Sequence, residues 1–343
     1  MSTPKELGFR MPAEWERHSA IWLSFPHDTE SFPHIERAQA AHADFVKEIS
    51  ETEMVELQVL DETTKAQVVA LLTERGANLA NVRFHIRDYA DIWFRDYGPL
   101  FVTNGQELAM TKWVFNAWGG KYDALLKDNG IPYEMNRAMN LRMFETGIVM
   151  EGGSIDVNGK GTVLTTEQCL LNKNRNPQLS KAEIEKYLDD YLHCGNVIWL
   201  TEGIEGDDTD GHIDDIARFV NDTTVVAALE ANPDDANYAA LKKNFEILQN
   251  SKDQDGKPLT VVSIPMPSPI LRENGSRLPA SYANFYIGNG KVVVPIFGVP
   301  EDEQVLEILG TVFPDRKVVG INAKYLVYGF GTFHCMSQQQ PAV

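Results

Sequence analysis

Four segments of the chain consist of two apolar runs separated by a short polar turn, the pattern of a β-hairpin. Each turn contains Asn-Gly or Asn-Asp, and Asn-Gly is the strongest short-range hairpin signal. The segments are GPLFVTNGQELAMTKWVF (98–115), GSIDVNGKGTVLTTEQCLL (153–171), ARFVNDTTVVAALE (217–230) and NFYIGNGKVVVPIFG (284–298). HSAIWLSFPHDTESFP (18–33) is predicted to supply a fifth, less regular copy.

Apolar residues at spacings of three and four predict amphipathic helices between the hairpins. The clearest stripe is Ile35, Ala38, Ala41, His42, Phe45, Val46 and Ile49. Residues 63–76 predict a helix that ends at Gly76. Ser180 and Glu183 have the spacing of a capping box at the start of another helix. Two further helices are predicted over 237–251 and 300–314, and strands over 55–60, 196–200, 259–265 and 316–321.

The chain therefore repeats, about five times, a unit of strand, hairpin, helix and strand. Repeats of one supersecondary unit indicate radial or linear stacking. Since no linker rich in Gly, Ser or Pro divides the sequence, residues 1–343 are expected to form a single α/β domain with internal pseudo-symmetry.

Charged or reactive residues stand just before the hairpins, where a core strand should begin. They are Arg95-Asp96, Glu151, the pair His212 and Asp214, and His334-Cys335. One such position would be an ordinary turn. Four at equivalent places in a repeat predict side chains that converge on a common axis.

Composition and charge narrow the possible partners. The 343 residues are 43% hydrophobic, enough for a large core, and carry a net charge of −18. This charge disfavours nucleic acid as a partner. It is compatible with steering of a small cation, although acidity also serves solubility alone. No apolar run is long enough for a membrane span, and the first residues do not resemble a signal peptide.

Three cysteines cannot all pair with one another within the chain, so reduced thiols in the cytoplasm are expected. Cys169, in a predicted apolar strand, and Cys194, at the end of a helix, are interpreted as structural. Cys335 follows Gly329 and Gly331, which permit close backbone approach. It is the candidate nucleophile, although a free cysteine is more often a small buried apolar residue.

His212 and Asp214 form a His-x-Asp pair that would point to one side of an extended segment. Histidine is the natural general acid and base near neutral pH. A metal site and a solvated acidic loop remain alternative interpretations. Asp96 lies among aromatic residues, and burial there would favour a cationic partner. Glu151 precedes two glycines, which would let a ligand approach.

These residue types together suit one substrate class. Two carboxylates match the planar donor geometry of a guanidinium group. A thiolate could attack its central carbon, while a histidine donates a proton to departing ammonia and then accepts one from water. This chemistry requires no metal and no cofactor.

Five segments in order resemble the agmatine deiminases of the guanidino-group-modifying family. They are MPAEWERHSAIWLSFPHD, DIWFRDYGP, EGGSIDVNGKGTVLTTEQCLLNKNRNP, DGHIDDIARFV and HCMSQQQP, spread from Met11 to Pro341. The resemblance implies a five-bladed α/β propeller. It also implies hydrolysis of agmatine to N-carbamoylputrescine and ammonia, a step toward putrescine, by an enzyme whose relatives form homo-oligomers.

The resemblance also implies a role for each motif residue. Cys335 corresponds to the nucleophile and His212 to the general acid and base. Asp96 and Asp214 correspond to the carboxylates that hold the guanidinium group, and Glu151 to the one that orients the histidine. Two further substrate contacts are implied: Asp208 near the distal amine, and Trp93 beside the alkyl chain.

The sequence departs from the family before the cysteine. Where the family commonly has Gly-Gly-Gly-Asn-Ile-His-Cys, this chain has Gly-Phe-Gly-Thr-Phe-His-Cys, so Phe330 and Phe333 are expected to alter the pocket. A deiminase of peptidyl-arginine or free arginine is the main alternative. A metal hydrolase, a cysteine peptidase and a noncatalytic binding propeller remain open from other classes.

Overall fold

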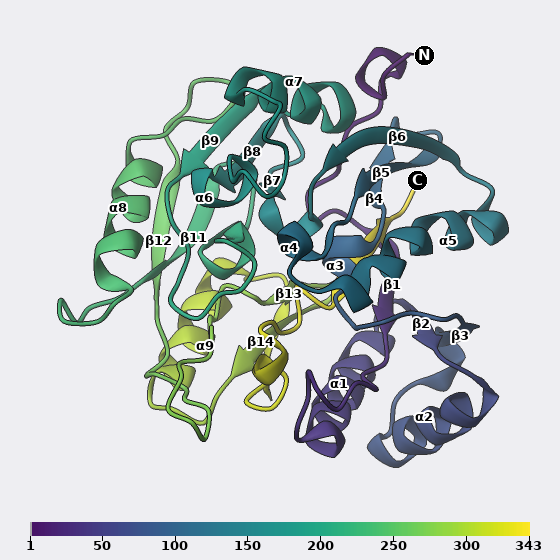
Figure 1. Cartoon of the computed structure of the whole chain (residues 1–343). Helices are drawn as coiled ribbons and strands as arrows, with labels where there is room; N and C mark the ends of the chain where they lie inside the picture. The colour runs from purple at the N-terminus through teal and green to yellow at the C-terminus, as the bar shows by residue number, and fades with distance from the viewer. Residues whose placement is uncertain (1) are drawn as a thin grey trace.

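Five small sheets surround the centre of the molecule (Figure 1). The computed structural model describes residues 2–343. In every sheet an antiparallel pair of strands is followed by a strand parallel to the second, reached through a helix. A parallel pair needs such a crossover, because the chain must return to the same end of the sheet. The predicted α/β repeat is confirmed.

We call the sheets blades 1 to 5. Blade 1 contains β16 (Ser337–Pro341), β1 (His18–Ser24), β2 (Met54–Val59) and β3 (Val82–Ile86). Blade 2 contains β4 (Leu100–Thr103), β5 (Leu108–Val114) and β6 (Arg142–Val149), and blade 3 contains β7 (Asp156–Val157), β8 (Thr162–Thr166) and β9 (Asn196–Leu200). Blade 4 contains β10 (Ala217–Phe219), β11 (Thr224–Leu229) and β12 (Thr260–Pro265), and blade 5 contains β13 (Tyr286–Ile287), β14 (Lys291–Ile296) and β15 (Lys317–Asn322).

The longer helices lie at the periphery of this ring (Figure 1). They are α1 (Ile35–Ser50) and α2 (Glu62–Arg75) on blade 1, α5 (Ile131–Met139) on blade 2, α7 (Lys181–Leu192) on blade 3, α8 (Tyr238–Gln249) on blade 4 and α9 (Glu301–Val312) on blade 5. Local signals define their ends as predicted. Gly76 ends α2 at a φ of 76°, and Ser180 and Glu183 form the capping box of α7.

Shorter helices connect these elements: η1 (Lys5–Leu7), η2 (Leu79–Asn81), α3 (Phe94–Tyr97), α4 (Ala117–Gly120), η3 (Asp123–Gly130), η4 (Gly152–Ser154), α6 (Glu167–Leu170), η5 (Ile213–Asp215) and η6 (Val327–Gly329). The structure places Cys169 in α6, so the prediction of an apolar strand there was wrong. The apolar run ends at β8, where the hydroxyl of Thr166 accepts a hydrogen bond from the backbone N–H of Cys169 and caps α6.

Blade 1 corrects the prediction for residues 18–33. This segment does not fold back on itself, because the antiparallel partner of β1 is β16 from the other end of the chain. Trp22 lies opposite Gln338, and its indole N–H donates to the Gln340 side chain at 2.9 Å. The polar run after Cys335 is therefore a mostly buried strand that closes the ring.

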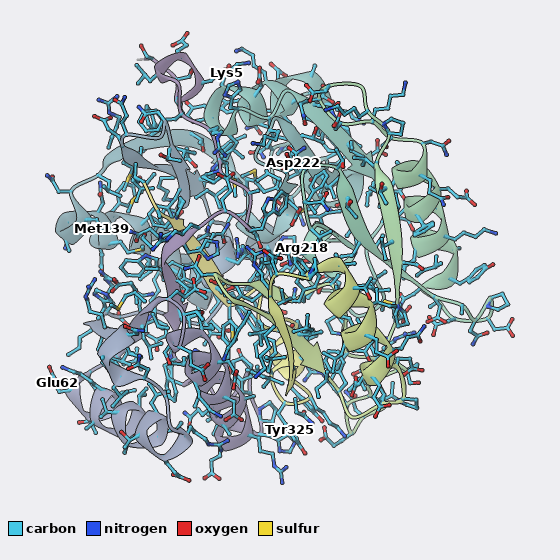
Figure 2. All side chains as sticks on the ribbon, turned by 180° about the vertical axis from the view of Figure 1, so that it is seen from behind. Lys5, Glu62, Met139, Arg218, Asp222 and Tyr325 are labelled. Atoms are coloured by element: carbon cyan, nitrogen blue, oxygen red, sulfur yellow. The ribbon has the colours of Figure 1, made fainter. Side chains whose placement is uncertain are left out.

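The centre of the ring holds buried charges, unlike the apolar cores of the blades. Arg218 of β10 lies near the middle of the molecule (Figure 2). It is fully buried and pairs with Glu14 and, at 2.5 Å, with Asp156. Arg95 also approaches Glu14 at 3.2 Å. Buried charges persist only where they are paired in this way. Within residues 2–343, the structure contains no helix suited to crossing a lipid bilayer.

Candidate active site

Short polar turns at the inner ends of the blades bring the predicted residues together. Asp96 lies in α3, Glu151 precedes η4, Asp214 lies in η5 and Cys335 precedes β16. Gly153 shows how closely three of the side chains approach. A Cβ atom there would lie 2.6 Å from Nδ1 of His212, 2.8 Å from Oδ1 of Asp96 and 3.1 Å from Oδ2 of Asp214.

The thiol of Cys335 lies 2.9 Å from Nδ2 of Asn284 and 3.3 Å from Oδ2 of Asp214. Its side chain is only 5% exposed. Burial raises the pKa of the Cys335 thiol well above its usual value, and the charges of Asp214, Asp215 and Asp96 raise it further. The free protein therefore holds this thiol protonated at neutral pH.

His212 is buried, and neither ring nitrogen has a hydrogen-bond partner. Nδ1 lies 3.7 Å from Asp96 Oδ1, and Nε2 lies 3.9 Å from Glu151 Oε2. Burial alone would lower the pKa of His212, but the carboxylate of Asp96 and contacts with Cys169 and Glu151 outweigh it, so the pKa is raised well above its usual value. The imidazole can therefore carry a proton, and its two ring nitrogens are free for other partners.

The segment with His212 and Asp214 is not extended, contrary to the prediction. His212 is the N-cap of η5, and Asp214 lies within this single turn. Both side chains nevertheless face Gly153, because η5 packs against η4 at the centre of the ring.

Arg175 connects Glu151 to an acidic loop. Its Nε donates to Glu151 Oε1 at 2.7 Å, Nη1 donates to Asp210 Oδ2 at 2.7 Å, and Nη2 donates to the carbonyl of Thr209 at 2.9 Å. Burial would raise the pKa of Glu151, but the charge of Arg175 and the contact with His212 lower it overall. Glu151 is therefore held as a carboxylate beside His212.

The two aspartates differ in their surroundings. Asp96 accepts hydrogen bonds from the Trp118 indole at 2.9 Å and from the Gly153 N–H at 3.0 Å. Burial raises the pKa of Asp96 to about 6. Burial would also raise the pKa of Asp214, but the hydrogen bond from His334 at 2.6 Å and its charge lower it overall.

His334 joins Asp214 to the buried charges at the centre of the ring. Its Nε2 lies 2.7 Å from Glu14 Oε1, while its Nδ1 contacts Asp214. Since ionised carboxylates only accept hydrogen bonds, both ring nitrogens act as donors. The second oxygen of Asp214, Oδ1, is buried and has no hydrogen-bond partner.

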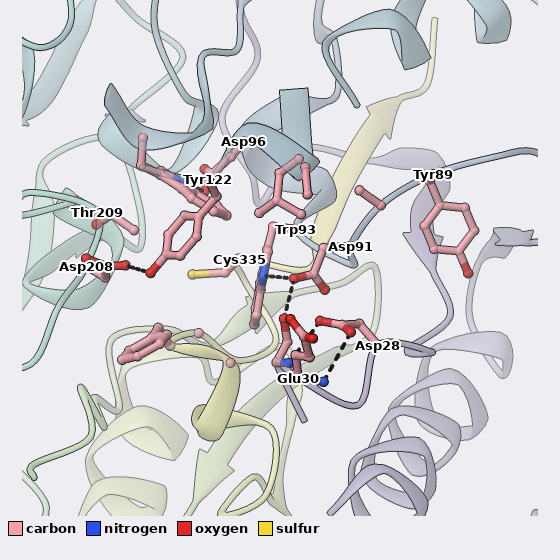
Figure 3. Close-up of a pocket in the computed structure, with 18 of the residues that line it drawn as sticks. Asp28, Glu30, Tyr89, Asp91, Trp93, Asp96, Tyr122, Asp208, Thr209 and Cys335 are labelled. Carbon is pink, nitrogen blue, oxygen red and sulfur yellow. Dashed lines mark hydrogen bonds between the residues drawn. The ribbon is translucent and has the colours of Figure 1, made fainter. Parts of the chain in front are cut away.

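A cavity of about 600 Å³ leads to the thiol. Figure 3 shows Cys335 with Asp208 and Tyr122 on one side and Trp93 and Asp91 on the other. The hydroxyl of Tyr122 donates to Asp208, and the indole N–H of Trp93 donates to Asp91 at 3.1 Å. The predicted residues Asp96, Asp208 and Trp93 all line this cavity.

The segment before Cys335 passes close to Trp93. A Cβ at Gly329 or at Gly331 would lie 2.7 Å from the Trp93 ring, which explains glycine at both positions. Phe330 lines the cavity. Phe333 does not, which corrects the expectation that both phenylalanines alter the pocket: it is fully buried and stacks on Phe45 of α1 at 4.8 Å between ring centroids.

Three residues at the site were missed by the sequence analysis. Asn284 stands just before the blade 5 hairpin, as the four predicted polar positions stand before theirs. This equivalent position in the repeat could have identified Asn284 from the sequence. Arg175 and Glu14 stand outside that pattern. Cys169, interpreted as structural, lies with its sulfur within 4.8 Å of the donor atoms of His212 and Glu151.

Two groups of donor atoms are close enough together to hold a metal ion, among the residues that the structure describes. They are Glu151, Cys169 and His212, and Asp214, Asp215 and Cys335. Glu151 is already neutralised by Arg175, and Asp214 contacts His334. Each group thus lies beside a positive partner, and the remaining acceptors fit an organic cation better than a divalent ion.

Five α/β blades surround a cysteine, a histidine and paired carboxylates, and the similarity to agmatine deiminases identifies the protein as a hydrolase of linear amidines. The chain belongs to the Porphyromonas-type peptidyl-arginine deiminase family, whose model matches residues 10–341.

Relatives within this family are similar over nearly their whole length. The agmatine deiminase of Stutzerimonas stutzeri (strain A1501) is 38% identical, with 99% of this chain and 98% of that protein covered. The solved agmatine deiminase of Enterococcus faecalis has a TM-score of 0.92 and 34% identity, covering 99% and 98% of the two chains. An amidinotransferase from Microseira wollei shares the fold alone, with a TM-score of 0.52 at 10% identity over 97% and 96% of the chains.

Proposed function

We propose that this protein hydrolyses agmatine to N-carbamoylputrescine and ammonia through a covalent intermediate on Cys335. The observation that carries the proposal is the placement of two buried carboxylates, Asp96 and Asp214, around one thiol and one unpaired histidine. A guanidinium group can donate to both carboxylates while its central carbon faces the sulfur. The agmatine deiminases among the relatives support this substrate.

Substrate binding activates the nucleophile in this proposal. In the free protein, burial and the charges of Asp96 and Asp214 keep the thiol protonated. A guanidinium cation bound between these carboxylates offsets their charge and lowers the pKa of Cys335. The thiol then gives its proton to solvent water in the cavity, and the thiolate is the attacking species.

The first half-reaction forms the C–S bond. The thiolate attacks the guanidinium carbon, giving a tetrahedral adduct. Protonated His212 donates its proton to an amino nitrogen of the adduct, and the C–N bond breaks to release ammonia. An amidino group remains attached to Cys335 as a thiouronium ion, held by Asp96 and Asp214.

The second half-reaction consumes water. Neutral His212 accepts a proton as the water oxygen bonds to the amidino carbon. The C–S bond then breaks as the hydroxyl proton of the adduct passes to the departing sulfur, so the carbon becomes the carbonyl of a urea and the Cys335 thiol is regenerated. Glu151, held by Arg175, stabilises the imidazolium form in both halves.

The distal end of the substrate decides between agmatine and arginine. We propose that Asp208 binds the distal ammonium, with Trp93 beside the alkyl chain. Both line the cavity that leads to Cys335. A peptidyl-arginine or free arginine substrate is the alternative, which the family description supports.

Ammonia release from equal concentrations of agmatine, arginine and a peptidyl-arginine tests this proposal. We expect agmatine to be preferred and Cys335→Ala to abolish release. Cys194→Ala is the matched control, because this second buried cysteine lies outside the cavity. Release from arginine compounds but not agmatine would refute the substrate assignment, and full activity of Cys335→Ala would refute the mechanism.

We also propose that residues 1–343 work as one catalytic domain, because turns from all five blades meet at the site. The partner would be a small cationic guanidine and not nucleic acid, in keeping with the net charge of −18. A homo-oligomer is proposed from the resemblance to the family, and sedimentation equilibrium would test it. The three unpaired cysteines favour a reducing compartment such as the cytoplasm.

A further inference from the structure

Phe330 adopts a backbone conformation that a bulky side chain rarely takes. Its φ is 74°, in the left-handed region, where it caps η6. A non-glycine residue in this region is strained relative to glycine, because its Cβ approaches the backbone. Gly329 and Gly331 flank Phe330, so glycine already occupies the positions on both sides of this residue. An outlier of this kind beside a nucleophile points to a role for the side chain.

The side chain of Phe330 packs against Arg272. The guanidinium carbon of Arg272 lies 4.7 Å from the centroid of the Phe330 ring and 5.4 Å from that of Tyr328. Its Nη2 donates to the carbonyl of Tyr328 at 2.5 Å. Arg272 is thus held against two aromatic rings, an arrangement that a cation–π attraction stabilises.

Phe330 and Arg272 line the same cavity as Cys335, together with Asp208 and Tyr122. Burial and the hydrogen bond to Asp208 raise the pKa of Tyr122 to about 12, and the charge of Arg272 opposes this rise. The cavity wall therefore carries both a carboxylate, that of Asp208, and a guanidinium group, that of Arg272. Such a pair could bind the two charged groups of an α-amino acid, whereas an ammonium alone needs only the carboxylate.

We propose that Phe330 is a specificity-determining residue that keeps Arg272 from binding a substrate carboxylate. Its ring packs against one face of the guanidinium group and occupies part of the cavity, so the wall favours an unbranched chain ending in an ammonium. A substrate with a carboxylate beside that ammonium meets a ring in place of an ion-pair partner. This inference rests on the proposed function, since it concerns the distal end of the same substrate.

Phe330→Gly tests the inference, because glycine adopts the observed φ without strain. We expect the ratio of kcat/KM for arginine to kcat/KM for agmatine to rise at least tenfold, through binding of the arginine carboxylate by uncovered Arg272. Adding Arg272→Gln to Phe330→Gly should reverse most of that rise. Phe333→Leu is the matched control: it should lower the melting temperature without changing the ratio, because this ring packs in the core.

The outcomes distinguish a failure of this inference from a failure of the proposed function. Wild-type protein that releases no ammonia from agmatine would refute the proposed function. Wild-type activity with an unchanged ratio in Phe330→Gly would refute only the inference, as would a raised ratio that persists in the double variant. Phe330→Asn, which also tolerates positive φ, provides the same measurement if the glycine variant does not fold.

Discussion

The raised pKa of Asp96 predicts that replacing it with Asn has opposite effects on activity and on stability. Asp96 titrates at about 6 in the folded protein, against 3.8 for an ordinary aspartate. At about 1.4 kcal/mol per pKa unit, ionising this buried group at pH 8 costs the folded state about 3 kcal/mol. The ionised Asp96 carboxylate thus lowers the stability of the folded protein, as expected for a charge that only a bound cation compensates.

The sign of the stability difference between wild type and variant follows from the upward shift of the Asp96 pKa. Above pH 6 the folded protein carries the unfavourable charge, and Asp96→Asn removes it. As the pH falls from 6 toward 4, the wild-type carboxyl takes up a proton in the folded state before the unfolded state does. The wild type therefore gains stability relative to the variant through that window, by about 3 kcal/mol in all.

Asparagine also loses one hydrogen bond. Asp96 accepts from both Trp118 and Gly153, whereas an amide has only one acceptor oxygen. With about 2 kcal/mol for that loss, the variant should be about 1 kcal/mol more stable than wild type at pH 8. Near pH 4 it should be about 2 kcal/mol less stable. For a chain of 343 residues these differences correspond to melting temperatures about 1 °C higher and about 3 °C lower.

Calorimetric melting temperatures of wild type and Asp96→Asn at half-unit steps from pH 4 to pH 8 provide the measurement. The difference between the two proteins matters, because buried acids remote from Asp96 titrate equally in both. Ammonia release from agmatine at pH 8 should fall about 10- to 100-fold, as expected for a lost charged hydrogen bond of 1.5–3 kcal/mol. A stability difference that does not vary with pH would refute the reasoning, because Asp96 would then carry no costly charge.

Two further substitutions test how the site is held. Arg175→Gln should leave Glu151 buried without its partner, lower the melting temperature by about 4–7 °C for a loss of 3–5 kcal/mol, and move the acidic limb of the kcat profile to higher pH. Arg175→Lys should restore part of the melting temperature and part of the shift in the kcat profile. An unshifted kcat profile in Arg175→Gln would show that Arg175 does not act through Glu151. Gly153→Ala would place a Cβ 2.6 Å from His212. It should lower kcat by about 100-fold, while a kcat near that of wild type would show that the site tolerates displacement.

Much of the fold could be predicted because its signals are local. Asn-Gly turns, the capping box at Ser180 and the glycine that ends α2 act within a few residues, so they can be read along the chain. The candidate site residues named from the sequence also precede recognisable hairpins. The segment 18–33 shows the limit: its sequence reads as a hairpin strand, but its partner lies more than 300 residues away.

Phe330 and Phe333 show that the sequence has the same limit at the site. They are two aromatic residues in one irregular segment, and no periodicity distinguishes a ring facing the cavity from one facing α1.

The repeated α/β unit and the helix ends can be read from local patterns along the chain, and so can the polar positions of Asp96, Glu151, His212, Asp214 and Cys335. The partners of these groups depend on how the blades are arranged in space. These partners come from other parts of the chain: Asn284 contacts the Cys335 thiol, Arg175 contacts Glu151, and Glu14 contacts His334. Their effect is electrostatic and depends on burial and distance, which exist only once the five blades have closed into a ring.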